Sequence, residues 1–256
     1  MQETISVIHE DKNFVAVYKP AGILVHSTKI SQNSEFRIQN YNDEPTLVDW
    51  LIKKYPEIKT IGDDPKTRPG IVHRLDKDTS GVMVIPRNQH YFEYLKKLFQ
   101  NHEVKKTYVA LVYGELLPKT GKIEKPISLK SGSVKRTVWK GKMEKEAITE
   151  YRVARSIEYR VMDGTEHRVS SNEKKLFSLV EVMPKTGRTH QIRIHMASIG
   201  HPIVGDSLYG KKTNPFGLTR QFLHAESLEW TSEDGRRIKI ECDLPEELRG
   251  VLEGSK

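Results

Sequence analysis

The stretch that most constrains this chain runs from Gly70 to Gly81, where charged and turn-forming residues separate two apolar segments. Thr79, Ser80 and Gly81 favour a turn, because hydroxyl groups satisfy nearby backbone groups and glycine adopts backbone angles that other residues avoid. The apolar residues 82–85 that follow indicate a short buried strand. The stretch therefore predicts a polar loop anchored by a rigid strand, which is a common position for catalytic groups.

Arg74 and Asp76 are the two residues of this loop that best suit chemistry on a ligand. Residues two apart in an extended segment project to the same side, so both side chains can face one ligand. A nearby guanidinium would keep the Asp76 carboxylate ionised at neutral pH, and such a carboxylate can act as nucleophile or base at a sugar carbon. The alternative is that Asp76 and Asp78 only cap turns and that Arg74 is a solvated cation.

Positive charge is the strongest bias in the composition: the 256 residues include 42 Lys and Arg against 34 Asp and Glu, a formal charge of +8. Segment 119–145 carries nine basic and two acidic residues, and segment 185–205 carries three basic residues and no acidic one. Such segments favour contacts with the phosphates of a nucleic acid, whereas the alternative for 119–145 is a solvated hairpin surface. We therefore expect a polyanionic partner.

Several classes of protein are disfavoured by what the sequence lacks. The single cysteine, Cys242, excludes an internal disulfide and favours a reducing compartment. No apolar stretch approaches the roughly 20 residues that span a bilayer, and the first residues lack the basic start of a signal peptide. His190 and His195 are five residues apart with no acidic residue between them, which disfavours zinc. Because no glycine-rich phosphate motif is present either, we expect a cytoplasmic protein without membrane contact, metal or cofactor.

Apolar periodicity and turn residues predict a chain that mixes strands and helices. The predicted strands cover residues 5–9, 14–18, 23–25, 82–85, 104–113 and 237–240, with short β segments from 113 to 183 and a hairpin inserted within 155–175 around a turn at Asp163–Gly164. The predicted helices begin after Thr46, after Asn88, within 185–196 as an amphipathic helix, and after Asp243. Residues 27–44 are polar without a clear period and predict a long loop.

Residues His73–Gly81, with the sequence HRLDKDTSG, resemble the catalytic motif of the RluA-type pseudouridine synthases. Three further stretches resemble motifs of that family and occur in the same order along the chain. They are the first motif at Lys19–Gly22 with Val25–His26, the tyrosine motif at Lys106–Gly114, and the third motif at Thr186–Arg193 with Gly205–Gly210. The resemblance extends over residues 14–230, and within it we expect Lys19 and Pro20 to form a turn that supports the site.

The resemblance implies an α+β fold with a mixed, mostly antiparallel β-sheet in two halves, flanked by helices and containing a central catalytic cleft. The predicted succession of strands and helices is compatible with that fold. The chain is long enough for one large domain or two small ones, and no linker divides it. We expect one catalytic domain over residues 1–256 and no separate N-terminal RNA-binding domain, since the β segments begin almost at Met1.

Individual site residues follow from the same resemblance. Asp76 matches the catalytic aspartate, Tyr108 the tyrosine that stacks on the target uracil, and Arg188 the arginine that pairs with the catalytic carboxylate. Arg74 matches the arginine that enters the RNA where the flipped base has left. The residues expected to bind RNA are Arg74, His73, Lys185, Thr189, His190, Gln191 and Arg193. Of these, we expect His190 and Gln191 to orient their loop more than to touch the RNA.

The resemblance implies an enzyme that isomerises specific uridines to pseudouridine in structured RNA, either ribosomal or transfer RNA. Such an enzyme flips the target base, uses an aspartate for the reaction and needs no cofactor. We expect a monomer that selects its uridine through the catalytic domain and its insertions, chiefly residues 27–44 and 155–175, which are longer than the family pattern. Two alternatives remain open. One is a catalytically inactive RNA-binding protein of the same fold, and the other is a nucleoside or glycoside hydrolase that uses Asp76 and Asp78.

Overall fold

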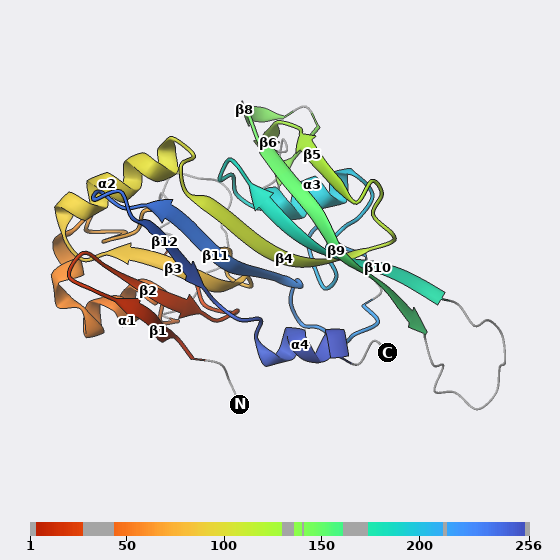
Figure 1. Cartoon of the computed structure of the whole chain (residues 1–256), viewed down its shortest axis with the longest axis horizontal. Coiled ribbons are helices and arrows are strands. Elements are labelled where there is room, and N and C mark those ends of the chain that lie inside the picture. The colour runs from red at the N-terminus through yellow and green to blue at the C-terminus, as the bar shows by residue number, and fades with distance from the viewer. Residues whose placement is uncertain are drawn as a thin grey trace, which may run out of the picture. The chain divides into compact units, whose positions relative to one another are not determined.

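The computed structural model describes residues 4–27, 44–129, 136–139, 141–160, 174–211 and 214–253. They divide into two compact units (Figure 1), the first from Met1–Val104 and Trp230–Ile240, the second from Lys105–Glu229 and Glu241–Lys256. The paired strands β11 (Leu223–Thr231) and β12 (Arg237–Glu241) contribute residues to both units. Each unit has strands and buried apolar residues of its own.

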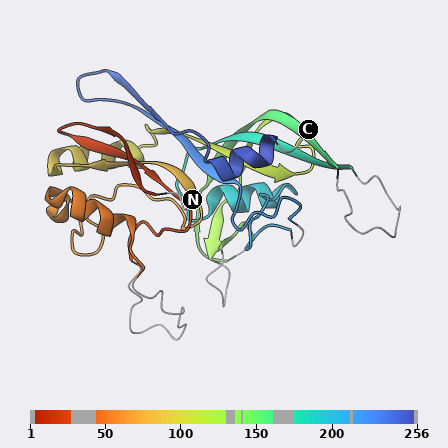
Figure 2. The ribbon, with the colours of Figure 1, turned by 90° about the horizontal axis from the view of Figure 1, so that it is seen from below.

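The first unit contains three antiparallel strands, in the order β1 (Ser6–Glu10), β2 (Phe14–Lys19) and β3 (Ser80–Pro86). All seven residues of β3 are buried, as its continuous apolar run predicts. In Figure 2, α1 (orange) lies below β1 and β2 (red). The helices of this unit are α1 (Leu47–Lys54), the 3₁₀ helix η1 (Pro56–Thr60) and α2 (Gln89–Gln100).

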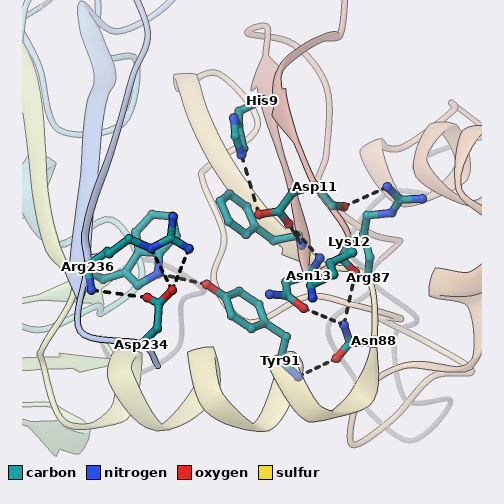
Figure 3. A network of polar contacts seen from close by, with 11 residues as sticks. His9, Asp11, Lys12, Asn13, Arg87, Asn88, Tyr91, Asp234 and Arg236 are labelled. Carbon is teal, nitrogen blue, oxygen red and sulfur yellow. Dashed lines mark hydrogen bonds and ion pairs between the residues drawn. The ribbon is translucent and has the colours of Figure 1, made fainter. Parts of the chain in front are cut away.

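An aromatic cluster forms part of the core of the first unit. Phe14 of β2 stacks on Tyr91 of α2, with ring centroids 5.6 Å apart, and meets Trp230 of β11 edge-on at 5.3 Å. The Trp230 indole N–H donates to the Tyr91 hydroxyl at 3.3 Å, and burial raises the pKa of Tyr91 to about 12. Figure 3 shows Asp11 and Arg87 in the same network, where the Asp11 carboxylate accepts the Phe14 N–H and Arg87 donates to the Asp11 carbonyl. These contacts join the β1–β2 turn to the start of α2.

The sheet of the second unit is antiparallel and has the strand order β11, β4, β10, β9, β5. The bounds of these strands are Lys105–Tyr113 for β4, Thr120–Glu124 for β5, Ile148–Arg160 for β9 and Lys174–Pro184 for β10. A smaller sheet has the order β7 (Arg136–Thr137), β6 (Ile127–Leu129), β8 (Lys142–Lys145).

Two helices pack their apolar residues into the core of the second unit. Leu111 of β4 and Phe177 of β10 belong to one buried cluster with Met196 of α3 (Gln191–Ser198) and Leu248 of α4 (Glu246–Glu253). All four side chains are fully buried, and each such side chain stabilises the fold by about 1.5–3 kcal/mol. None of the helices in the described part of the chain is long and apolar enough to cross a membrane.

The structure confirms the predicted α+β class with a mostly antiparallel sheet, and it confirms most of the predicted elements. The strands expected at 5–9, 14–18, 82–85, 104–113 and 237–240 are present, as are the helices expected after Thr46 and Asn88. The last helix begins at Glu246, three residues after Asp243. The turn predicted at Asp163–Gly164 and almost all of the loop predicted at 27–44 lie outside the described residues.

The prediction of a strand at residues 23–25 is wrong, because two of these residues accept hydrogen bonds from a helix instead. The carbonyls of Leu24 and Val25 accept the N–H groups of Leu47 and Val48 at 2.9 and 3.0 Å. Those N–H groups belong to the first turn of α1, where a helix supplies no partner of its own. The segment therefore caps a helix that is distant in sequence.

Two expectations for the second unit are also wrong. The region before residue 183 is not a succession of short β segments only, because β9 and β10 form one long antiparallel pair of 13 and 11 residues. The hairpin expected within 155–175 is present as the far end of that pair, since Arg160 pairs with Lys174. Helix α3 is not amphipathic, because its residues from Gln191 to Met196 are all buried.

The capping box at the start of α1 predicts the effect of removing the Thr46 hydroxyl. Thr46 Oγ1 accepts the Asp49 N–H at 3.3 Å, and the Asp49 carboxylate accepts the Thr46 N–H at 2.8 Å. Thr46→Ala should lower the free energy of unfolding by about 1 kcal/mol, because a helix N–H loses its partner. Urea unfolding measures the loss. Thr60→Ala is the control, since that exposed hydroxyl only donates to the Glu57 carbonyl, and an equal loss in both variants would contradict the capping role.

Candidate active site

The loop that carries Asp76 begins at Gly70 and ends at Thr79. Gly70 has a φ of +68°, and a side chain there would collide with η1, so glycine is required at this entry. The Thr79 N–H donates to the Asp76 carbonyl at 3.2 Å and closes a turn. Leu75 is buried, whereas Arg74 is exposed and Asp76 half-buried. Leu75 therefore fixes the loop while its two charged neighbours stay near the surface.

Lys19, in the first motif, supports this loop through a fully buried side chain. Its ammonium donates to the carbonyls of Pro20 at 2.7 Å, Ile23 at 2.9 Å and Lys77 at 3.0 Å. The Gly22 N–H donates to the same Lys77 carbonyl at 2.9 Å. Because Lys77 follows Asp76 directly, these bonds fix the backbone beside the carboxylate. Lys19 ends β2 and the turn follows at residues 21–22, so the predicted turn lies slightly later in the chain, and the support comes from the Lys19 ammonium.

His73 and Arg74 are neighbours in sequence but differ in their contacts. The Val84 N–H of β3 donates to His73 Nε2 at 3.0 Å, and the His73 ring stacks on Phe99 of α2 with centroids 4.6 Å apart. His73 is thus held by two elements of the first unit. Arg74 is exposed, and within the described residues its side chain forms no hydrogen bond or ion pair.

Tyr108 and Lys106 lie on β4, and because they are two residues apart they project from the same face of the strand. Tyr108 is half-buried opposite Val182 of β10. Lys106 is 9% exposed, and its ammonium donates to the Lys185 carbonyl at 3.4 Å. Burial, together with the positive charge of Lys185, lowers the pKa of Lys106 to about 8. Lys106 belongs to the tyrosine motif, and its position two residues before Tyr108 is the sequence signal that places it on the same face of the strand.

Gln191 shapes the loop that leads into α3. Its side-chain oxygen accepts the Thr186 hydroxyl at 2.7 Å and the Arg188 N–H at 3.0 Å. Its side-chain nitrogen donates to the Ile148 carbonyl at 2.9 Å and to Thr149 Oγ1 at 3.0 Å. The buried amide therefore binds protein on both sides, which agrees with the expectation that Gln191 orients its loop.

The other residues of this loop differ in exposure. Lys185 and Thr189 are exposed, and the Lys185 ammonium lies 2.9 Å from the Glu150 carboxylate. Arg188 is half-buried, and its Nε donates to the Glu146 carbonyl at 2.8 Å. That bond fixes the guanidinium through one of its five N–H donors.

A buried ion pair joins α3 to residues 206–209. Arg193 donates to Asp206 through Nε at 2.7 Å and through Nη2 at 2.9 Å, and the two side chains are 5% and 0% exposed. The Asp206 carboxylate also accepts the N–H groups of Leu208 and Tyr209 at 2.9 and 3.0 Å. Burial by itself would raise the pKa of Asp206, but Arg193 and these two N–H groups hold the pKa below its ordinary value.

Tyr209 extends this rigid cluster to two other segments. Its hydroxyl lies 3.0 Å from His190 Nδ1 and accepts the Arg136 N–H of β7 at 3.2 Å. The Arg193 guanidinium lies over the Tyr209 ring, 5.3 Å from its centroid. The sequence predicted that Arg193 contacts RNA. In the structure its guanidinium binds Asp206 inside the protein, so we assign Arg193, like His190 and Gln191, to positioning the loop.

The predicted site residues therefore form one group in each unit. The group in the first unit lies on a single loop. The group in the second unit lies on β4, on the connection from β10 to α3 and at the start of α3. The first group contains His73, Arg74 and Asp76, and the second contains Tyr108, Lys185, Arg188, Thr189, His190, Gln191 and Arg193.

The lowered pKa of Lys106 predicts that this lysine destabilises the fold at neutral pH. Below pH 8 the ammonium is buried in the folded state, and between pH 8 and about 10.5 only the unfolded chain keeps the proton, so stability rises with pH. Lys106→Met should raise the free energy of unfolding at pH 7 by about 2–3 kcal/mol, a gain that disappears toward pH 10.5. Urea unfolding at both pH values measures it, and a gain independent of pH would contradict the prediction.

The ion pair predicts a large effect of neutralising Asp206. Asp206→Asn leaves the Arg193 guanidinium buried without an opposite charge, so the free energy of unfolding should fall by about 3–5 kcal/mol. Glu115→Gln, at an exposed carboxylate of the same unit, is the matched control and should change it by less than about 0.5 kcal/mol. Unfolding in urea compares the two variants. Similar small losses in both would show that the pair contributes little.

The sequence of this chain matches one family of known proteins. The family described as RNA pseudouridylate synthase matches residues 13–198. A relative from Aquifex aeolicus (strain VF5), named an uncharacterized RNA pseudouridine synthase, is 39% identical over 210 residues, which is 82% of this chain and 57% of that protein. A relative from Borreliella burgdorferi, named ribosomal large subunit pseudouridine synthase D, is 34% identical over 88% of this chain and 60% of that protein. The chain thus spans about three fifths of the length of these two relatives.

A solved structure shows the same fold. The structure titled human RNA pseudouridylate synthase domain containing 1 superposes with a TM-score of 0.69 over 96% of this chain and 85% of that chain, at 23% identity. The matches confirm the resemblance that the motifs predicted. The chain belongs to the RluA-type RNA pseudouridylate synthase family.

Proposed function

We propose that this chain isomerises uridine to pseudouridine in structured RNA. The observation that carries the proposal is the family match over residues 13–198, which includes both groups of site residues. The formal charge of +8 supports an RNA substrate, because Lys and Arg side chains neutralise phosphates.

Asp76 is the reacting group in this proposal. Its carboxylate is half-buried, and the buried Leu75 and the Lys19 ammonium fix the backbone on either side of it. The carboxylate attacks C1′ or removes a proton from the ribose, so that the bond between C1′ and N1 breaks. The freed uracil then turns, C5 bonds to C1′, and the hydrogen on C5 is lost while N1 gains one. The product is an isomer of the substrate, so no cofactor is consumed.

The other site residues hold the flipped nucleotide in this mechanism. Tyr108 stacks on the target uracil, which suits an aromatic ring that is half-buried on a rigid strand. Arg188, held through Nε by the Glu146 carbonyl, pairs with the catalytic carboxylate, and the exposed Arg74 fills the gap in the RNA. Lys106 places a positive charge on the Tyr108 face of β4, where it attracts the negatively charged RNA.

The finer features of the function are part of the same proposal. Ribosomal and transfer RNA are both candidate substrates, and the name of the Borreliella relative makes ribosomal RNA the first to test. We propose that both units serve one catalytic domain, and that the chain acts as a monomer in the cytoplasm. The lone cysteine supports a reducing compartment.

Two alternatives make different predictions for the same assay. A protein of this fold that has lost the reaction would bind RNA without converting uridine. A nucleoside hydrolase would release free uracil, and it would need a second carboxylate on the other side of the scissile bond. Asp76 and Asp78 lie on one turn, which does not suit that arrangement.

Asp76→Asn should abolish the reaction. The amide has the shape of the carboxylate but cannot attack C1′ or accept a proton, so tritium release from RNA labelled at uracil C5 should fall by at least about 10³-fold. Tritium is the appropriate label because C5 loses its hydrogen when it forms the bond to C1′. RNA affinity, measured by filter binding, should change by less than about threefold.

Asp78→Asn is the matched control, since this half-buried carboxylate lies two residues away on the same turn. It should retain most of the tritium release. Turnover by Asp76→Asn would remove Asp76 from the mechanism. Binding without tritium release by the unmodified chain would support the inactive protein, and free uracil among the products would support the hydrolase.

A further inference from the structure

Trp139 is the most exposed large hydrophobic side chain in the described part of the chain, at 78%. It belongs to a segment that we call the basic arm, which consists of residues 127–129, 136–139 and 141–145 and contains the sheet β7-β6-β8. Met143, in the same arm, is 68% exposed. Two large exposed hydrophobic side chains in one short segment make that segment a candidate binding surface, and tryptophan is enriched at interfaces.

The backbone of Trp139 is fixed by the arm. The Ser128 hydroxyl donates to the Trp139 carbonyl at 2.8 Å, and the Trp139 N–H donates to Thr137 Oγ1 at 3.1 Å. Gly141 allows β8 to approach β6 closely, because a side chain there would collide with the Leu129 carbonyl. The indole is therefore presented by a rigid turn, with its ring open to solvent.

The arm is joined to the loop that carries Arg188. The Arg136 N–H donates to the Tyr209 hydroxyl, which also contacts His190 of that loop. The Glu146 carbonyl, directly after the arm, accepts Arg188 Nε at 2.8 Å. Ile127 of β6 also packs in a small buried cluster with α3. A ligand held by Trp139 is thus held in a fixed relation to Arg188 within the second unit.

The charge of the arm favours a nucleic acid as its ligand. Arg136, Lys142 and Lys145 supply three positive charges against Glu144. An aromatic platform among cations is the arrangement that binds unpaired nucleotides, because bases stack on the ring and phosphates pair with the cations. Stacking requires a base whose face is free, so duplex RNA fits this surface poorly.

We propose that the basic arm is a second RNA contact, in which an unpaired base of the substrate stacks on Trp139. This inference rests on the proposed function, because it places the RNA beside the Arg188 loop. It also assigns the arm to binding and not to the chemical step.

Substitution of Trp139 in the full chain tests the inference. Trp139→Ala should weaken the binding of substrate RNA by about 5- to 100-fold, the range of one base stack, and should raise KM more than it lowers kcat. Trp139→Phe keeps an aromatic face and should stay within about threefold of the unmodified chain. Leu117→Ala is the control, because Leu117 is 61% exposed in the same unit but lies outside the arm.

Tryptophan fluorescence reports the contact without any need for turnover. A uridine decamer should quench the emission more than a duplex of the same length, and the quenching should be lost in Trp139→Phe, since Trp230 is buried and Trp50 half-buried. Anionic lipid vesicles should leave the emission unchanged.

The outcomes separate the inference from the proposed function. If the chain releases tritium and Trp139→Ala binds and converts RNA like the unmodified chain, the inference is overturned and the proposed function stands. If the chain releases no tritium but the decamer still quenches Trp139, the arm is an RNA-binding surface and the proposed function fails. A shift of the emission with vesicles and none with the decamer overturns the inference in favour of a membrane surface.

Discussion

The buried ion pair between Arg193 and Asp206 organises the second unit. Removing two charges from water costs several kcal/mol for each ion, and only good geometry with further hydrogen bonds offsets that cost. Here Arg193 binds both carboxylate oxygens, and two backbone N–H groups bind Asp206 as well. Tyr209 follows directly, and its hydroxyl contacts both His190 and Arg136. The ion pair thus helps to hold the Arg188 loop and the basic arm in place, together with the Gln191 amide and the Ile127 cluster.

The first unit uses the same physical device with an uncharged partner. The buried ammonium of Lys19 is stabilised by main-chain carbonyls, and one of them belongs to the residue after Asp76. In both units, therefore, a buried cation positions a loop, and the groups proposed to meet the RNA, such as Arg74 and Trp139, are exposed. The motifs of this chain contain both buried cations that position loops and exposed cations that are proposed to meet the RNA. Residue type alone does not distinguish the two.

The local parts of the structure could be predicted from the sequence, because their signals lie within a few residues. The caps of α1 and α2, the buried strand β3 and the polar loop before it all follow from short patterns. The errors arise where the partner is distant. Leu24 and Val25 bind the start of α1, and polar residues of α3 are buried against partners on β9 and at Asp206. Neither partner can be read from a window of one helix or one strand.

The candidate site was predictable to a similar degree. The motif resemblance identified Asp76, Tyr108 and Arg188 by position, and the structure gives each a defined local setting whose catalytic role is a proposal. The motif resemblance did not separate Arg193, which binds protein, from its exposed neighbours. The sequence does not show that Asp206 faces Arg193 in the fold. Trp139 lies in a segment that the sequence marked only as cationic, and its exposure became visible once the fold of β6, β7 and β8 was known.

The coordination of Lys19 has a consequence for the choice of cation. Three carbonyl oxygens converge on one nitrogen, and an ammonium offers three donors from a single atom. A guanidinium is flat and spreads its donors over three nitrogens, so arginine at this position cannot reach the same three oxygens without moving the chain. The loop beside Asp76 therefore selects a lysine by the directions of its hydrogen bonds, even though both side chains carry the same charge.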